Sequence, residues 1–293
     1  MSETSNKVKK YKSLKRKQMV SNTIIYVVLI LMAIIWLTPF VLIVLESLRC
    51  ETTMQVGYVI PKQIGLDNYI ALFKDTDFGI WYRNTFIIAA ATAIIQTFMV
   101  LCMSYTLSRM RFAGRKFLMN FMLVLGMFPG FIGMIILYKV LSGMGLTGAN
   151  SVPGIILVGT ASSAMGYYVS KGFFDTIPKS LDEAARVDGA TRAQVLFKIT
   201  LPMAKPIVIY TVLTAFMGPW ADFMFASYIA HNTSAGMNVA VGLQNMIGTS
   251  SSLAAHYTHF CAGGVLVAIP VTILFMCLQK YYVEGVTAGG VKG

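Results

Sequence analysis

The sequence predicts an all-α integral membrane protein with six transmembrane helices and both termini in the cytoplasm. Hydrophobic residues make up 56% of its 293 positions and charged residues only 12%, and the mean hydropathy is +0.67. Such a chain has too little polar surface to coat a soluble protein. Six windows are long and apolar enough to cross a hydrocarbon core about 30 Å thick, and basic residues gather in segments that would share one side of the membrane.

The six predicted spans are bounded by charged residues or by loop-forming residues. Every backbone amide in lipid needs an internal partner, so we expect helices and not open sheets. The fourth span follows a glycine-rich loop, and the fifth is interrupted only by Asp222. The spans cover residues 24–45, 84–108, 117–138, about 152–170, about 206–230 and about 260–279.

The orientation follows from the positions of the 24 Lys and Arg residues. If the N-terminus is cytoplasmic, seven lie in the N-terminal tail, four between spans 2 and 3, six between spans 4 and 5, and two after span 6. Only five fall in the three external loops, and the positive-inside rule then places both termini in the cytoplasm. Topology and attraction to anionic lipid headgroups explain the net charge of +12, so no nucleic-acid partner is expected.

The chain divides into three predicted parts. A basic cytoplasmic tail covers residues 1–21, a six-helix membrane domain covers 22–284, and a glycine-rich cytoplasmic tail covers 285–293. The first apolar stretch is too long for the core of a signal peptide, and no small-residue cleavage site follows it before Glu46. We therefore expect it to remain as a span.

Several kinds of chemistry lack the residues that they need. The sequence has no Gly-x4-Gly-Lys-Ser/Thr phosphate loop, so any ATP and Mg²⁺ must be bound by a partner. His231, His256 and His259 lie in the last predicted external loop without a Cys or carboxylate to complete a metal site. Asp222 is the one ionisable group clearly within a span, whereas a proton- or sodium-coupled carrier needs several. We expect no catalytic residue, metal site or cofactor in this chain.

The long cytoplasmic loop over residues 171–205 has the sequence features of two short helices. Ser180 can cap the first helix, with Glu183 three residues later as its capping-box partner. This helix should run to about Val187 and end at Gly189, because glycine adopts the left-handed conformation that closes a helix.

The second helix of the loop begins after Thr191, with Gln194 as its capping partner, and covers about residues 192–199. It should end at Leu201-Pro202, because the residue before a proline is pushed out of the helical region. Each helix carries a small apolar stripe. From periodicity alone, the pair could equally fold back on the protein's own cytoplasmic end.

Seven residues of this loop resemble the full EAA signature of permease subunits of binding-protein-dependent ABC importers. The match consists of Glu-Ala-Ala, three residues, Gly, nine residues, Ile, one residue and Leu-Pro. The loop also lies between the expected two spans of a six-span chain. The matching residues are Glu183, Ala184, Ala185, Gly189, Ile199, Leu201 and Pro202.

The resemblance implies that this loop is a coupling helix, which sits in a cleft of a cytoplasmic ATPase dimer. Ala184 and Ala185 would allow the partner to approach closely, and Glu183 would form a charge-assisted contact or serve only as a cap. Gly189 would let the chain turn between two rigid helices, so that closure of the ATPase could pass to the spans as a rigid-body movement.

The C-terminal tail carries a second resemblance. By composition alone, a glycine-rich tail after the last span would be disordered. Its sequence, however, is similar to the tail of the G-type permease subunit of maltose/maltodextrin importers, which reaches between the two ATPase subunits. The residues that would do so are Thr287, Gly289, Gly290 and Lys292.

The resemblance also implies partners and a cargo. The expected partners are a second homologous permease subunit, a cytoplasmic ATPase dimer and an extracellular sugar-binding protein, assembled in the cytoplasmic membrane of a bacterium. The expected cargo is a maltodextrin or similar oligosaccharide, although importers of galacto-oligosaccharides or other glycosides share the loop and similar tails. A coupled secondary carrier is the alternative from a different class.

Two further regions are candidates for contact with the cargo or the binding protein. Pro219 breaks the fifth span, and carbonyl groups freed there must face protein or water, so Trp220 and Asp222 could line the pathway. The alternative is that Trp220 is an interfacial anchor and Asp222 packs against a partner chain. By resemblance, the last external loop includes a scoop-like segment that enters the binding protein's sugar site, with residues Gly248, Ser250 and Ser251.

Overall fold

The computed structural model describes residues 2–51, 58–127, 130–231 and 233–290, and the regular elements within these ranges are helical. One isolated antiparallel β-bridge joins Arg49 and Ile64. The elements are α1 (Ser2–Ser47), α2 (Asp67–Asp75), α3 (Phe78–Arg109), α4 (Arg115–Met127), α5 (Gly130–Gly143), η1 (Gly148–Asn150), α6 (Ser151–Ala161), α7 (Ala164–Thr176), α8 (Lys179–Val187), α9 (Arg192–Val195), the π-helical turn η2 (Leu196–Thr200), α10 (Leu201–Met203), α11 (Lys205–Ala221), α12 (Met224–Ala230), η3 (Ser234–Gly236), α13 (Val239–Met246) and α14 (Ser250–Gly290).

Four segments are long and apolar enough to cross a membrane, and they cover residues 18–47, 78–109, 148–176 and 250–281. Two pairs of helices pass the same test together but are bent, α4 with α5 by 102° and the α9–α10 run with α11 by 85°. The described residues therefore provide up to six spans, if each bent pair counts as one. The predicted all-helical class with several apolar spans is confirmed.

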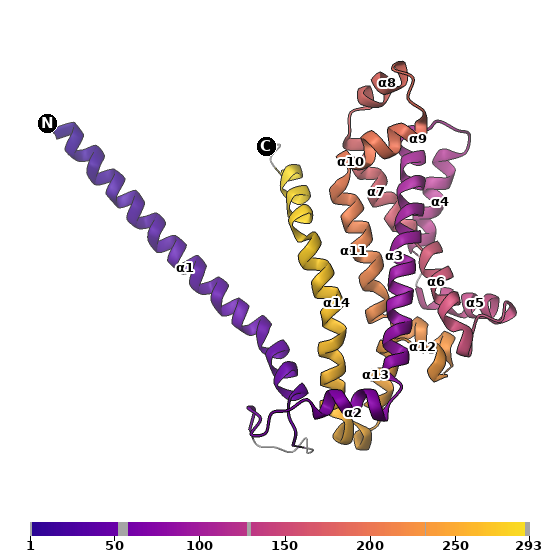
Figure 1. Cartoon of the computed structure of the whole chain (residues 1–293). Helices are drawn as coiled ribbons and strands as arrows, with labels where there is room; N and C mark the ends of the chain where they lie inside the picture. Colours follow the sequence, from indigo (N-terminus) through magenta and orange to yellow (C-terminus); the bar gives the residue numbers. More distant parts are fainter. Residues whose placement is uncertain (1, 52–57, 128–129, 232, 291–293) are drawn as a thin grey trace.

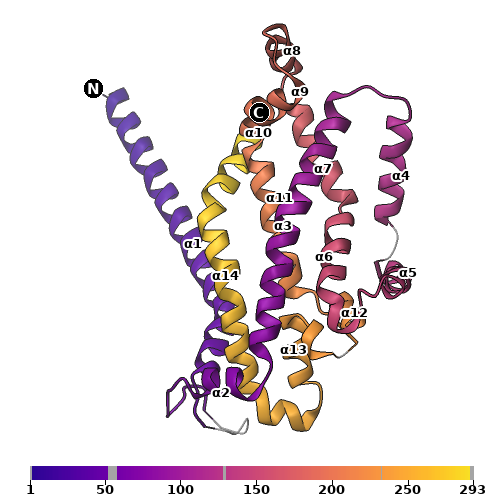
Figure 2. The same ribbon diagram turned by 45° about the vertical axis from the view of Figure 1, so that its right-hand side comes forward.

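The helices α3, α11 and α14 and the α6–α7 pair stand side by side as a bundle (Figures 1 and 2). α3 packs against α11, α7 and α6, while α14 packs against α11 and α1. α8 projects beyond one end of the bundle, and both ends of the chain lie toward that end, whereas α2 and α13 lie at the opposite end. α1 leans away from the body, and its side chains from residue 18 to 44 are exposed.

Buried side chains form two clusters, one toward each end of the bundle. The cluster toward α2 and α13 includes Ile88 and Trp220. The cluster toward α8 includes Tyr105 of α3, Phe174 of α7 and Val195 of α9. The α8 end therefore has its own packed core, which fixes the loop over residues 171–205 to the bundle.

Three of the predicted spans are divided. Span 3 becomes α4 and α5 with the bend of 102° between them. Span 4 divides into α6 and α7 at Ser162 and Ser163, and span 5 divides into α11 and α12 at Asp222 and Phe223. Pro219 contributes to the last break, because it has no N–H to donate within the final turn of α11.

The last span is longer than expected. α14 begins at Ser250, well before the predicted start at about residue 260, and continues through the predicted boundary at residue 285 to Gly290. Once a helix has formed, each further residue adds a hydrogen bond without a new nucleation cost, and this offsets the weak helix propensity of glycine. The glycine-rich segment is helical as far as Gly290, and the loop before the last span, which the sequence predicts to be external, is shorter than predicted.

Candidate functional site

The helix α8 carries the Glu-Ala-Ala part of the signature at the outer end of the molecule (Figure 1). It begins directly after Pro178 and has no side-chain cap. The predicted cap by Ser180 and Glu183 is therefore wrong, because the helix already starts at Lys179 and Ser180 lies inside its first turn. Pro178 occupies the position before the first turn instead, and its ring fixes the backbone φ angle at the start of the helix.

Gly189 ends α8 in a Schellman motif. Its N–H donates to the carbonyl oxygen of Arg186 at 3.1 Å, and the N–H of Ala190 donates to that of Ala185 at 2.9 Å. The φ of Gly189 is +85°, a left-handed conformation that residues with a Cβ rarely adopt. No neighbouring heavy atom lies within 4 Å of the position of a Cβ, so glycine is required by backbone conformation and not by space. The predicted bend between two helices is present.

The second helix of the loop starts as predicted and ends differently. Thr191 N–H donates to Gln194 Oε1 at 2.7 Å, and Gln194 N–H donates to Thr191 Oγ1 at 3.3 Å, which confirms the capping box. The helical run does not stop at Leu201, because the wider π-helical turn η2 precedes Pro202 and α10 continues to Met203. The chain then turns by 85° into α11.

Arg109, at the end of α3, holds α8 in place. Its Nε lies 2.8 Å from Asp182 Oδ2, and its Nη2 donates to the carbonyl oxygen of Ile177 at 2.9 Å. The Arg109 and Asp182 side chains are only 6% and 11% exposed, so loss of either partner would leave a nearly buried charge. This ion pair could not be predicted from the sequence, because the two residues are far apart in the chain and no local spacing links them.

Asp175, near the end of α7, ties α7 to α3. Ser108 Oγ donates to Asp175 Oδ1 at 2.6 Å, and Lys171 Nζ lies 2.5 Å from Asp175 Oδ2. Together with Arg109, these contacts join the ends of α3, α7 and α8. A force applied to α8 therefore meets helix ends that are linked by charge-assisted bonds and not by a loose loop.

One face of α8 packs on the protein, and the other face is free. Ala185 is half-buried and packs against the cluster toward α8. This contact agrees with the alternative from the sequence, in which the helix pair folds back on the protein's own end. Glu183 and Ala184 are exposed, and Val187 is 87% exposed. Of the other signature residues, Ile199 and Leu201 are half-buried and Pro202 is exposed. The loop is thus anchored on one side and open to a partner on the other.

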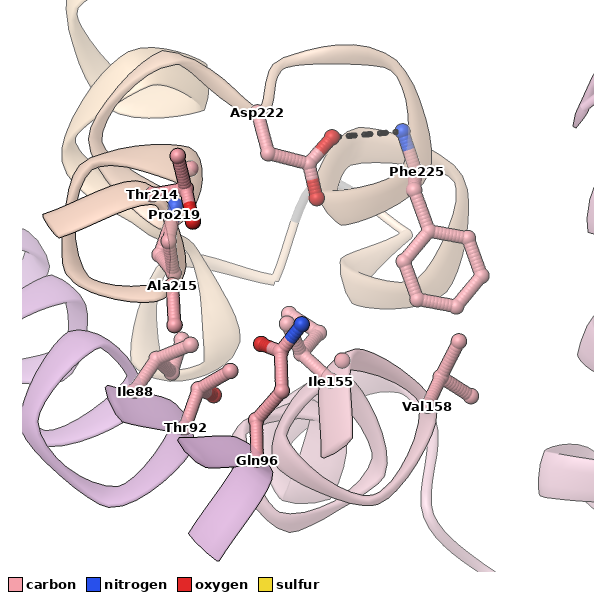
Figure 3. A pocket seen from close by; sticks show the side chains of 12 residues that line it. Ile88, Thr92, Gln96, Ile155, Val158, Thr214, Ala215, Pro219, Asp222 and Phe225 are labelled. Atoms are coloured by element: carbon pink, nitrogen blue, oxygen red, sulfur yellow. Dashed lines mark hydrogen bonds between the residues drawn. The ribbon is translucent and has the colours of Figure 1, made fainter. Parts of the chain in front are cut away.

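A cavity of about 320 Å³ lies between α3, α6, α11 and α12 (Figure 3). Asp222 lines it, at the break between α11 and α12. Asp222 Oδ1 accepts a hydrogen bond from the N–H of Phe225 at 3.2 Å. The polar side chains of Thr92, Gln96 and Thr214 line the same space.

Trp220 does not line this cavity. It is 5% exposed, and its ring packs with centroids 5.3 Å from Tyr82 and 6.1 Å from Phe216. The structure thus separates the two residues predicted for the pathway, placing Asp222 at the cavity and Trp220 in the core. Trp220 is also not an interfacial anchor within this chain, because such an anchor would expose its ring edge.

Asn238, just before α13, holds the break at Asp222 in position. It is 1% exposed, and its Nδ2 donates to the carbonyl oxygens of Asp222 at 2.6 Å and Pro219 at 3.2 Å. Its Oδ1 accepts the N–H of Val241 at 2.9 Å and so caps α13. One amide therefore satisfies the carbonyl groups that the broken helix leaves free.

The other candidate residues lie at opposite ends of α14. Gly248, Ser250 and Ser251 are exposed where the helix begins, and Thr249 N–H donates to Ser252 Oγ at 3.1 Å in its first turn. Thr287, Gly289 and Gly290 lie in its last turns, toward α8 and on the same end of the molecule (Figure 1). Lys292 falls outside the described residues.

The loop that precedes α2 is held by a buried arginine. Arg49 is 1% exposed and forms a bidentate pair with Glu46, with both N···O distances at 2.8 Å. Glu51 accepts from the backbone N–H groups of Lys62 and Gln63 at 2.8 and 3.2 Å. Partial burial opposes its ionisation, but these hydrogen bonds outweigh that effect and lower the pKa of Glu51 below its ordinary value.

Comparison with protein families and curated proteins gives consistent matches. Residues 101–287 match the family described as binding-protein-dependent transport system inner membrane component. The chain is 33% identical to the maltodextrin transport system permease protein MalD of Streptococcus pneumoniae, over 96% of this chain and 99% of that protein. It is 34% identical to the galactooligosaccharides transport system permease protein GanQ of Bacillus subtilis, over 92% of this chain and 94% of that protein.

A solved structure has a similar fold. It is described as a bacterial ABC transporter involved in the import of the acidic polysaccharide alginate. The TM-score is 0.75 at 24% sequence identity, and the superposition covers 91% of this chain and 98% of the other. The arrangement of helices described above is therefore one that occurs in a solved ABC transporter.

Proposed function

The chain belongs to the family of binding-protein-dependent transport system inner membrane components, and we propose that it is the permease subunit of an ATP-driven importer that brings a maltodextrin-like oligosaccharide into a bacterial cell. The similarity to a maltodextrin permease runs along nearly the whole chain and is not confined to one motif. Together with the apolar spans, it supports a role as the membrane component of an ABC sugar importer.

We place the protein in the cytoplasmic membrane with six spans. The bent pair of α4 and α5 counts as one span and α11 with α12 as another, while α9 and α10 stay in the loop, and the excess of basic residues puts both termini and α8 in the cytoplasm. The view in Figure 1 supports this placement, because both chain ends lie toward the α8 end of the bundle. The opposite end, with α2, α13 and the start of α14, then faces the extracellular side.

Energy for transport comes from a partner ATPase dimer, which binds ATP and Mg²⁺. α8 inserts its exposed face, with Glu183 and Ala184, into a cleft of that ATPase. Closure of the dimer pushes α8, and the Arg109–Asp182 pair and the packed cluster toward α8 pass the movement to α3 and α11. Gly189 allows α8 and the following helix to keep a fixed angle while they move.

The two ends of α14 contact different partners in this proposal. The segment with Gly248, Ser250 and Ser251 faces an extracellular sugar-binding protein and enters its sugar site during transfer. The last turns, with Thr287, Gly289, Gly290 and Lys292, reach the interface between the two ATPase subunits. A second homologous permease subunit completes the pathway, and the exposed apolar side chains of α1 suit contact with that subunit or with lipid.

The observation that carries the proposal is the exposed face of α8 at the end of the bundle, on a chain whose whole length matches sugar permeases. Purification tests it: the chain should co-elute with a second permease and an ATPase, and in proteoliposomes ATP hydrolysis should rise when the loaded binding protein is added. Sugar uptake by this chain alone without ATP would instead identify a secondary carrier and refute the proposal.

A galacto-oligosaccharide is the second candidate cargo, because the identity to the galactooligosaccharide permease is as high as that to the maltodextrin permease. A sugar panel with the cognate binding protein separates the two. The cargo is the sugar that stimulates ATP hydrolysis at the lowest concentration; a panel in which maltotriose has no effect would exclude the maltodextrin assignment.

A further inference from the structure

Two broken helices meet at one cavity near the middle of α3. α6 and α7 are separated at Ser162 and Ser163, and α11 and α12 are separated at Asp222 and Phe223. Irregular backbone at membrane depth is stable only where it is buried in protein or lines a water-filled space. The cavity of about 320 Å³ borders the Asp222 break, and Gln96, which lines it, reaches the other break through a 2.6 Å hydrogen bond from its Nε2 to Ser163 Oγ.

Polar groups from different helices converge on this space (Figure 3). One carboxyl oxygen of Asp222 accepts the N–H of Phe225, and the other is turned toward the open space on the side of Gln96. Because the Gln96 amide nitrogen is engaged with Ser163, its carbonyl oxygen is left as an acceptor. Thr92 is 3% exposed, and its hydroxyl has no hydrogen-bond partner among the described residues.

Thr92 and Thr214 add hydroxyl-bearing side chains to the polar part of the lining. The rest of the lining is apolar, with Ile88, Ile155, Val158 and Phe225 among its residues. A few polar groups set in an apolar wall, in a volume of this size, are typical of small-molecule sites. Sugar rings present both hydroxyl groups and apolar C–H faces, and this lining matches both.

The charge of the cavity selects between kinds of sugar. Asp222 is acidic, and none of the 12 lining residues is Lys or Arg. A carboxylate is an acceptor only, so it favours ligands that donate hydroxyl protons and repels ligands that are themselves carboxylates. A solved structure with a similar fold belongs to an importer of an acidic polysaccharide, so fold alone does not fix this choice and the cavity residues do.

We propose that this cavity is a hydrogen-bonding subsite for an uncharged sugar in transit, with Asp222 and Gln96 as acceptors of sugar hydroxyls, so that this subunit contacts the cargo itself and disfavours uronates. The inference rests on the proposed function as a sugar permease and adds which residues of this subunit contact the cargo and why an acidic sugar is disfavoured. A purely structural role of Asp222 as the cap of Phe225 N–H makes a different prediction, because asparagine preserves that cap.

The test uses the complete complex in proteoliposomes, with the cognate binding protein, and measures labelled sugar moved per ATP hydrolysed. The variants are Asp222→Asn and Gln96→Leu, and the matched control is Asp75→Asn, which removes the same charge from an exposed position on α2. With its oxygen kept on the Phe225 N–H, Asn presents an NH2 donor to the cavity in place of the second carboxylate oxygen. The sugar hydroxyl then loses its charged acceptor, which reduces binding by about tenfold to a hundredfold. We expect Asp222→Asn to reduce the amount of maltotriose or galactobiose moved per ATP by at least about tenfold relative to the wild type. Gln96→Leu should reduce the same ratio by about fivefold.

The Asp75→Asn control should retain the wild-type ratio, and co-purification with the partner subunits shows that each variant is folded. Wild-type ratios in both cavity variants would overturn the inference, as would transport of an alginate trisaccharide by the wild-type complex as efficiently as an uncharged sugar. If no sugar stimulates ATP hydrolysis by the wild-type complex, the proposed function is wrong. This result comes from the wild-type protein alone, so it is distinguishable from a failure of the cavity inference.

Discussion

Replacing Gly189 by valine tests whether the bend after α8 transmits movement from the ATPase. The φ of +85° lies in the left-handed region, which costs an L-residue about 1–2 kcal/mol and a β-branched residue more. Because no neighbouring heavy atom lies within 4 Å of the Cβ position, the penalty is conformational and not a clash. A penalty of about 2 kcal/mol lowers the population of the bent loop roughly thirtyfold relative to competing shapes.

A series of substitutions at this position should follow the backbone penalty. Asparagine tolerates the left-handed conformation, so Gly189→Asn should stay close to wild type, Gly189→Ala should be intermediate and Gly189→Val should be the most affected. The assay is sugar uptake per ATP hydrolysed by the complete complex in proteoliposomes. We expect Gly189→Val to insert and co-purify but to lose most of its uptake per ATP.

Gly114 provides a matched control for this series. It lies in the loop between α3 and α4, has a φ of +83° and likewise has no heavy atom within 4 Å of a Cβ position. Gly114→Val therefore introduces similar backbone strain on the same end of the bundle without touching α8. Normal uptake by Gly189→Val, or equal uncoupling by Gly114→Val, would refute the idea that the bend at Gly189 has a specific role in coupling.

Four further predictions concern other contacts. Asp182→Asn should lower the stability of the α8 end by about 3–5 kcal/mol, because Arg109 keeps a nearly buried charge without its partner; protease cleavage within α8 in the detergent-solubilised complex should increase, and unchanged cleavage would contradict this. Asn238→Ala should cost about 1–3 kcal/mol for each carbonyl left unpaired, which a thermal unfolding scan of the purified complex measures against the wild type. Deleting residues 287–293 should leave assembly intact and reduce uptake per ATP, and unchanged uptake would remove the tail from the mechanism. Glu51 has a lowered pKa in the folded protein, so its stabilisation of the loop is full above the ordinary value of about 4.3 and is lost as pH falls through the lowered pKa; the protection factors of the Lys62 and Gln63 amides against hydrogen exchange, corrected for the intrinsic rate at each pH, should fall on acidification in the wild type and much less in Glu51→Gln.

The sequence was most informative where one local rule dominates. Lipid requires long uncharged helices, so each span predicted from hydropathy overlaps an observed apolar helix or bent pair, although the ends of spans 5 and 6 were misplaced. The bend at Gly189 and the capping box at Thr191 were also predictable, because each depends on residues within one turn. The Ser180 cap was predicted wrongly, since a proline one residue before the helix competes with it and the pattern alone does not rank the two.

The features that the sequence could not supply depend on distant residues. Serine is only a weak helix breaker, so no local residue pattern marked the division between α6 and α7. At this division Ser163 accepts a hydrogen bond from Gln96 of α3, a residue far away in the sequence. The Arg109–Asp182 ion pair likewise joins residues that are distant in the sequence, so no local pattern predicts it. Trp220 and Asp222 are two residues apart and looked alike as pathway candidates, but the break in the helix turns them to different surroundings.

The pairing of α1 with α14 has a consequence for how the protein is made. α1 leaves the ribosome before the other described helices, and α14, its main packing partner among them, leaves after the others. Until α14 has been synthesised, α1 stands in the bilayer without that neighbour, and its exposed apolar side chains make this state stable in lipid. A chain truncated before residue 250 should therefore insert α1 normally. Because α14 is missing, α1 cannot pack against it, and we expect membrane quality-control proteases to degrade the truncated chain.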